Sequence, residues 1–155
     1  MKFAYSSLAC PTWTVEEAIE AAVRYGYDAI EWRMADGEII TSETPPTVRR
    51  RLREVPAAHN IAIACLDTSC KAVQATAEER TQVIEEARRM IDLAAEMGAS
   101  FVRIFGGALP EGTTRAAIIE PTAAVLRTIG AYGADHNVTV TVETHDAWSN
   151  SADVL

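Results

Sequence analysis

The sequence predicts an α/β fold built on a parallel β-sheet. Short apolar or β-branched segments alternate with longer segments of helical periodicity, five times over in 155 residues. Two helical segments open with capping boxes, Thr14–Glu17 and Thr76–Glu79, and each is followed by a glycine, Gly26 or Gly98, where helices commonly end. Residues 61–66 form a near-continuous apolar run, which is typical of parallel strands covered on both faces.

In the first half of the chain we expect three strands and two helices. A strand over residues 3–8 stops before Pro11, and apolar residues then recur at helical spacing until Gly26. Residues 27–33 form the second strand. Residues 34–46 are rich in Asp, Gly, Ser, Thr and Pro and predict a loop. A helix with an Arg-rich face over residues 47–59 leads to the third strand at 61–66.

In the second half we expect two more strands and two more helices. A long helix between Thr76 and Gly98 precedes the fourth strand at residues 101–105. Helical sequence then runs to about residue 136. We expect Pro121 to split it, since proline cannot donate to the helix and clashes with the preceding turn. The fifth strand, residues 138–143, has the clearest alternation of apolar and polar residues.

Residues 1–155 are expected to form a single domain, because no sharp boundary or low-complexity segment interrupts the pattern. Each unit takes roughly 30 residues, the size of a βα unit in an eight-fold barrel of about 250 residues. An open, flavodoxin-like sheet has the same element count and fits the length of this chain better. The pattern leaves both architectures open.

Composition excludes several classes of protein. The net charge is -8, and the chain has two lysines and no basic run, so nucleic acid is a poor partner. No run of about 18 apolar residues could cross a membrane, and the first residues do not resemble a signal peptide. Three cysteines without an export signal predict reduced thiols in the cytoplasm.

The fifth strand carries the most informative candidate site. Its valines share one face, while Thr139, Thr141, Glu143 and His145 share the other. If the valines pack under helices, Glu143 and His145 point into a barrel at the carboxyl end of the strand, where α/β proteins place their sites. A carboxylate and an imidazole can bind a divalent metal or move a proton. The alternative is that both are solvated strand-end residues.

Two other strand ends offer polar or aromatic side chains to a substrate. Glu31 and Arg33 share a face of the second strand and could bind the hydroxyls of a polar substrate, or form a structural ion pair. Trp13 follows the first strand and is a further candidate for substrate binding. Arg103 on the fourth strand is expected to be a structural partner of Glu31 or Glu143.

Three segments together resemble the N-terminal part of the sugar phosphate isomerase/epimerase family, the xylose isomerase-like barrels. They are residues 26–33 (GYDAIEWR), 98–107 (GASFVRIFGG) and 140–145 (VTVETH). The resemblance implies a (β/α)8 TIM barrel, of which this chain holds roughly the first five βα units. It also implies a divalent metal (Mn, Mg, Co or Zn) and a small carbohydrate substrate. By this resemblance Glu143 is a metal ligand and catalytic base, the remaining ligands lie outside the sequence, and His145 matches a common family residue.

The resemblance implies a metal-dependent sugar (phosphate) isomerase or epimerase, incomplete in these residues. Residues 148–155 read as a loop, a cap and one opening turn of a helix, which supports a fragment. An inosose-type dehydratase on the same barrel is an alternative. So is a non-catalytic five-stranded module that binds a partner or pairs with itself as a homo-oligomer. The related endonucleases carry metal-binding His residues on strands three and four, and this chain has none there.

Overall fold

A five-stranded parallel sheet organises the chain in the computed structural model, which describes residues 1–145 and residue 148. The strands are β1 (Ala4–Ser6), β2 (Ala29–Trp32), β5 (Ala62–Lys71), β6 (Phe101–Phe105) and β7 (Thr139–Glu143). They lie side by side in chain order, β1-β2-β5-β6-β7. A flavodoxin-like sheet has the order 2-1-3-4-5 instead, so the sequential order decides for a section of a βα barrel.

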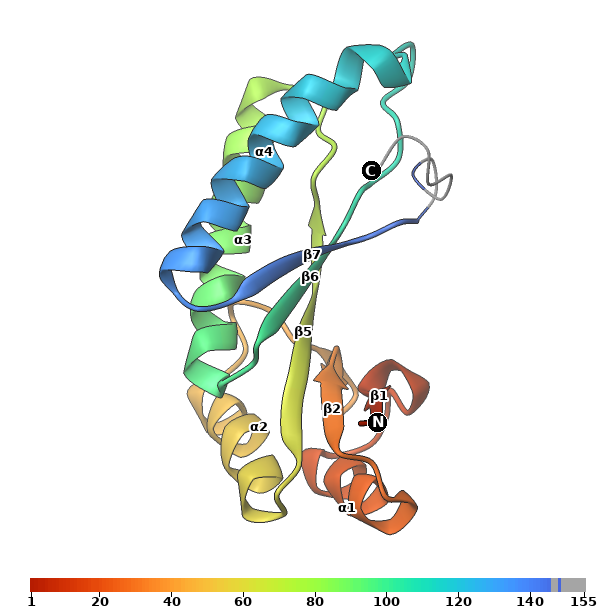
Figure 1. Ribbon diagram of the computed structural model, residues 1–155, viewed down its shortest axis with the longest axis vertical. Helices are drawn as coiled ribbons and strands as arrows, with labels where there is room; N and C mark the ends of the chain where they lie inside the picture. Colours follow the sequence, from red (N-terminus) through yellow and green to blue (C-terminus); the bar gives the residue numbers. More distant parts are fainter. Residues whose placement is uncertain (146–147, 149–155) are drawn as a thin grey trace.

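The four α-helices of the described residues contribute to one core on a single face of the sheet. They are α1 (Val15–Tyr25), α2 (Pro46–Ala58), α3 (Ala77–Met97) and α4 (Arg115–Asp135), and a short 3-10 helix, η1 (Ser7–Ala9), follows β1. Figure 1 shows α2, α3 and α4 along one side of the sheet, and no α-helix of the described residues covers the opposite side. In a barrel that uncovered side is the interior.

Apolar and polar side chains alternate along the strands, so one face of the sheet is apolar and the other is polar. Ile30, Trp32, Leu66, Val102 and Ile104 are fully buried against the helices in one hydrophobic cluster. The partly buried Val140 and Val142 pack against the same cluster. Thr139, Thr141 and Glu143 therefore face the uncovered side, which confirms the expected orientation of the fifth strand.

The segment predicted as a loop over residues 34–46 contains a small hairpin, so that prediction was wrong in part. Its antiparallel strands are β3 (Met34–Ala35) and β4 (Glu38–Ile39). They are joined by Asp36 and Gly37, whose φ angles are 56° and 84°. Two left-handed residues are what a type I′ turn requires, and Asp-Gly is its sequence signal.

The predicted break at Pro121 was also wrong, because α4 is continuous from Arg115 to Asp135. Proline removes one helical hydrogen bond, whereas the Thr114 cap and the burial of Ile118 and Val125 hold the helix on both sides of it.

The third strand is longer than expected and ends at Lys71 rather than at residue 66. Its polar residues break the apolar pattern, but its backbone still pairs with β6 at Asp67 and Lys71, with an irregularity in between. This extension carries Asp67 and Ser69 into the sheet. Among the described residues, no helix is long and apolar enough to cross a membrane.

Candidate active site

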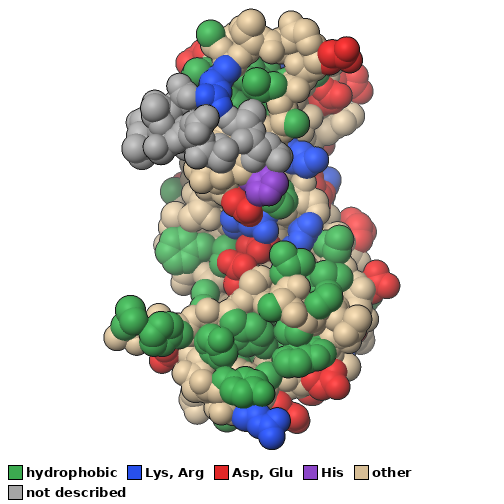
Figure 2. Space-filling view, turned by 90° about the vertical axis from the view of Figure 1, so that its right-hand side faces the viewer, with side chains coloured by type: hydrophobic (Ala, Val, Ile, Leu, Met, Phe, Trp, Pro, Cys, Tyr) green, Lys and Arg blue, Asp and Glu red, His purple; other side chains and the backbone are tan. Residues whose placement is uncertain are grey.

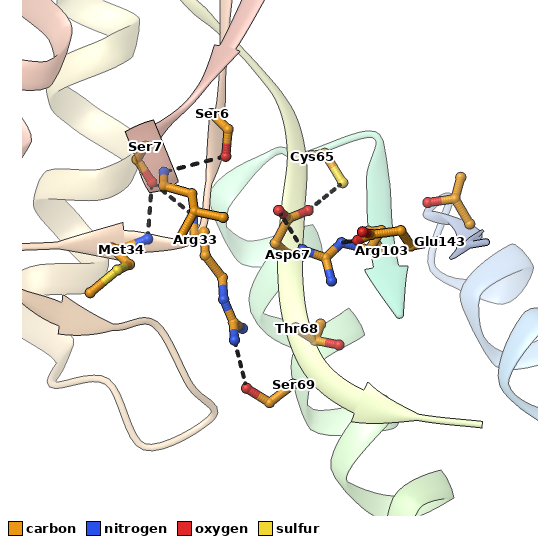
Figure 3. A network of polar contacts seen from close by, with 12 residues as sticks. Ser6, Ser7, Arg33, Met34, Cys65, Asp67, Thr68, Ser69, Arg103 and Glu143 are labelled. Atoms are coloured by element: carbon orange, nitrogen blue, oxygen red, sulfur yellow. Dashed lines mark hydrogen bonds and ion pairs between the residues drawn. The ribbon is translucent and has the colours of Figure 1, made fainter. Parts of the chain in front are cut away.

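A row of charged side chains crosses the uncovered face of the sheet near the carboxyl ends of its strands. It consists of Glu31 on β2, Asp67 on β5, Arg103 on β6 and Glu143 on β7, and we call it the charged ladder. Figure 3 shows Asp67, Arg103 and Glu143 side by side. Figure 2 shows charged groups gathered midway along this face, with hydrophobic side chains below them. One charged residue from each of four adjacent strands is thus brought to the edge where α/β barrels place their sites.

Arg103 is the centre of the charged ladder. Its Nη2 atom lies 2.8 Å from Oδ2 of Asp67, and its Nε atom lies 3.0 Å from Oε2 of Glu143. The guanidinium also lies over the ring of Phe105, 4.2 Å from the ring centroid. The side chains of Arg103 and Asp67 are only 13% and 3% exposed, so each charge depends on the other for compensation. The expectation that Arg103 pairs with Glu143 is confirmed.

Glu31 forms the other end of the ladder, beside Asp67. Burial raises the pKa of the Glu31 carboxyl above its ordinary value, a hydrogen bond with Ser6 opposes this, and a hydrogen bond and negative charge from Asp67 raise the pKa further. Two carboxyl groups so close favour sharing a proton. Glu31 can therefore act as a proton donor more readily than an ordinary surface glutamate.

Three possible metal ligands lie close together at this end, and Asp67 among them is already engaged by other groups. One donor atom each of Glu31, Cys65 and Asp67 lies within 4.8 Å of the others. Without a metal ion the Cys65 thiol is protonated at neutral pH, because burial and then Asp67 raise its pKa to about 12. Both oxygens of Asp67 are already engaged, by Arg103 and by the Cys65 Sγ atom at 3.6 Å.

Glu143 is a separate candidate ligand at the other end of the ladder. Its side chain is 40% exposed and forms an ion pair with Arg103 through Oε2, which leaves its second oxygen for another partner. A carboxylate is a hard oxygen ligand suited to Mg²⁺ or Mn²⁺ and acceptable to Zn²⁺. One carboxylate does not make a metal site, so a metal bound at Glu143 would need further ligands.

Arg33 lies at the end of β2 and is fixed from both sides. Its backbone N–H and that of Met34 each donate to the Oγ atom of Ser7 at 2.9 Å, and Ser7 is buried. The Arg33 Nη2 atom donates to the Oγ atom of Ser69 on β5 at 3.0 Å (Figure 3). Among the described residues no ion pair joins Arg33 to Glu31, which was one alternative left open by the sequence.

The two remaining candidates are placed differently. The ring of His145 meets that of Phe105 edge to face at 5.9 Å, and its backbone N–H donates to the Glu143 carbonyl at 2.9 Å. His145 therefore lies directly after β7, beside the ladder. Trp13 is 39% exposed and lines a surface groove with residues of α1, including Glu17 and Arg24. The structure does not bring Trp13 to the ladder, and the substrate-binding roles of both residues stay predictions.

Sequence reasoning missed Asp67 as the principal partner of Arg103. A signal was present, because Asp67 is a lone acid directly after a buried apolar run. A carboxylate there must find a cation on a neighbouring strand. Identifying Arg103 as that cation requires knowledge of the strand order, because 36 residues separate Asp67 from Arg103 in the sequence.

The fold and the ladder define a section of a parallel βα barrel with a charged site at the carboxyl ends of its strands. The chain belongs to the xylose isomerase-like TIM barrel family, whose sequence model matches residues 19–153. No curated protein is detectably similar to it in sequence.

Solved structures of the same fold extend well beyond this chain. The IOLI protein with a bound zinc atom has a TM-score of 0.76 at 17% identity over 92% of this chain and 51% of its own. A probable 3-DHS dehydratase, AsbF, from Bacillus anthracis has a TM-score of 0.72 at 18% identity, over 94% and 53%. A D-allulose 3-epimerase from Methylomonas sp. has a TM-score of 0.70 at 18% identity, over 96% and 52%. The chain thus spans about half the length of these structures.

Proposed function

We propose that the chain is the N-terminal part of a metal-dependent sugar or sugar phosphate isomerase or epimerase. The observation that carries this proposal is the position of Glu143, which ends β7 on the barrel side and is held by Arg103 while partly open. The family, the zinc-bound IOLI structure and the epimerase structure support it.

Glu143 would serve as a ligand for Mn²⁺, Mg²⁺, Co²⁺ or Zn²⁺ and as the base that takes a proton next to a carbonyl. The bound metal would polarise that carbonyl and a neighbouring hydroxyl. Arg103 would fix the orientation of the Glu143 carboxylate through its Nε–H. The other ligands would come from later strands, so residues 1–155 alone are expected to bind metal weakly and not to turn over a ketose.

A dehydratase, of the inosose type or another, is the second candidate. It begins with the same proton abstraction but must also protonate a leaving hydroxyl. The favouring observation is Glu31, whose pKa is raised by burial and by Asp67, so the chain offers a second carboxyl suited to proton donation. The similar fold of a probable 3-DHS dehydratase is consistent with this alternative.

Isotope exchange tests the proposal without knowledge of the exact sugar. A protein that carries these residues together with the strands that follow would be incubated in D₂O with Mn²⁺ and a panel of ketoses and inososes. We expect deuterium to enter next to the carbonyl, and Glu143→Gln to slow this by about 10²- to 10⁴-fold. The exposed Glu20→Gln on α1 is the control. Exchange at the wild-type rate in Glu143→Gln would contradict the role of Glu143.

A further inference from the structure

Arg33 is a half-buried guanidinium that pairs with no carboxylate of the described residues. Its side chain donates to the neutral hydroxyl of Ser69, and its Nη1 atom is buried with no acceptor among the described residues. Arg51, by contrast, is paired with both Glu16 and Asp36. A cation that loses hydration is normally compensated by a partner charge, so the partner of Arg33 is missing from the described part of the chain.

Arg103 is a second cation close to Arg33 on the uncovered face, where it lies among carboxylates. The pKa of the Arg33 guanidinium is lowered, first by burial and then by the positive charge of Arg103, while Asp67 and Cys70 oppose this. Asp67 is already engaged by Arg103. Arg103 also leaves its Nη1 atom buried and without an acceptor among the described residues. Two guanidinium groups thus retain unused N–H donors near one another.

We propose that Arg33 and Ser69 bind an oxyanion of the substrate, a carboxylate or a phosphate. The proposal rests on the proposed function, because it assigns a substrate class to the same site. The planar fork of arginine matches both anions in a bidentate way, and the Ser69 hydroxyl, which accepts from Arg33, retains its own hydrogen for donation. A neutral sugar could accept hydrogen bonds here but would not bring a counter-charge to the half-buried guanidinium.

The overall charge of the protein is negative and gives no long-range attraction for an anion. With a net charge of -8, the chain repels anions at long range, so an anion bound beside Arg33 would be held by local geometry. The position of Arg33 and Ser69 also suits an anionic group at one end of the substrate. Ser69 lies on β5 two residues beyond Asp67, so the anion would sit at one end of the ladder, with Glu143 beyond Arg103 at the other.

Nuclear magnetic resonance of the arginine Nε–Hε groups tests the inference directly. The protein would be titrated, without added metal and at constant ionic strength, with inorganic phosphate, acetate and glycerol. We expect one or both anions, but not glycerol, to shift the Arg33 signal saturably. Tighter binding of phosphate indicates a phosphorylated substrate, and tighter binding of acetate indicates a carboxylate. No saturable shift with either anion would overturn the proposal.

Matched variants identify the residue responsible. Arg33→Gln should weaken anion binding by about 10- to 100-fold. Arg33→Lys keeps the positive charge and should weaken anion binding less. It also allows the test to be made if Arg33→Gln does not fold. Arg24→Gln, at an exposed arginine of α1, should bind as the wild type does. Equal binding by all three variants would refute a role of Arg33.

The test is separable from that of the proposed function. Anion binding should persist in Glu143→Gln, because Glu143 contacts Arg103 rather than Arg33. Loss of isotope exchange with intact anion binding would leave this inference standing. Intact exchange without anion binding would overturn the inference alone.

Discussion

The Nε atom of Arg103 lies 3.0 Å from Oε2 of Glu143, while its Nη2 atom lies 2.8 Å from Oδ2 of Asp67. The proposed metal ligand on β7 is therefore held by a cation that also neutralises a buried acid on β5. This arrangement makes Arg103 both a structural residue of the sheet and a positioning residue for Glu143.

Replacing Arg103 should be costly for stability. Arg103→Met leaves Asp67 buried without its counter-charge, and breaking a buried pair in this way typically lowers the free energy of unfolding by about 3–5 kcal/mol. Urea unfolding measures the loss. Arg127→Met is the control, because the pair of Arg127 with Glu120 is exposed and such pairs contribute about 0–1 kcal/mol. A similar small loss for both variants would argue against the ladder as a buried network.

Glu31 should make stability depend on pH. Its pKa is raised in the folded protein, first by burial, so the folded state binds its proton more tightly than the unfolded chain does. The stabilisation is complete below the ordinary glutamate pKa of about 4.3 and is lost as the pH rises through the raised value. Glu31→Gln should therefore flatten the pH profile of the unfolding free energy above that pH.

Glu79 provides a control of opposite sign. Its pKa is lowered because it accepts from the backbone and side chain of Thr76 in the capping box of α3. Its contribution is present above the ordinary glutamate pKa and is lost as the pH falls. Glu79→Gln should therefore change the acid side of the profile. If Glu31→Gln and Glu79→Gln altered the profile in the same direction, the assignment of Glu31 would be wrong.

Two glycines of α4 should respond oppositely to alanine. A Cβ atom at Gly133 would come within 2.6 Å of the Val138 carbonyl oxygen, whereas one at Gly130 meets nothing within 4 Å. Gly130→Ala should raise the unfolding free energy by about 0.5–1 kcal/mol through helix propensity. Gly133→Ala should lower it by about 1–3 kcal/mol, because backbone must move. Thermal and urea unfolding of the two variants measure these changes and so check the contact of α4 with the start of the last strand. Equal changes in unfolding free energy would contradict that contact.

Local signals in the sequence predicted local structure well. The capping boxes at Thr14 and Thr76 form as expected, with both reciprocal hydrogen bonds. The alternation of Thr and Val in the last strand placed Glu143 on the correct face. The Asp36-Gly37 turn was equally local, and its hairpin was missed because the surrounding polar residues resemble a loop.

Non-local relationships could not be predicted in the same way. The strand order separates a barrel section from an open sheet, and it depends on which edges pair across the whole sheet rather than on any one segment. The pairing of Asp67 with Arg103 follows from that order. Pro121 shows the reverse case, in which tertiary burial of Ile118 and Val125 overrides an unfavourable local residue.

Metal binding by a protein that carries these residues with the strands that follow tests the central claim most directly. Mn²⁺ or Zn²⁺ would be titrated by calorimetry into the wild type, Glu143→Gln and the exposed control Glu20→Gln. We predict one tight site in the wild type and the control, and for Glu143→Gln a loss in affinity of at least the roughly 10- to 100-fold that removal of an outer-shell partner causes. Equal affinity in all three proteins would contradict the assignment of Glu143 as a metal ligand.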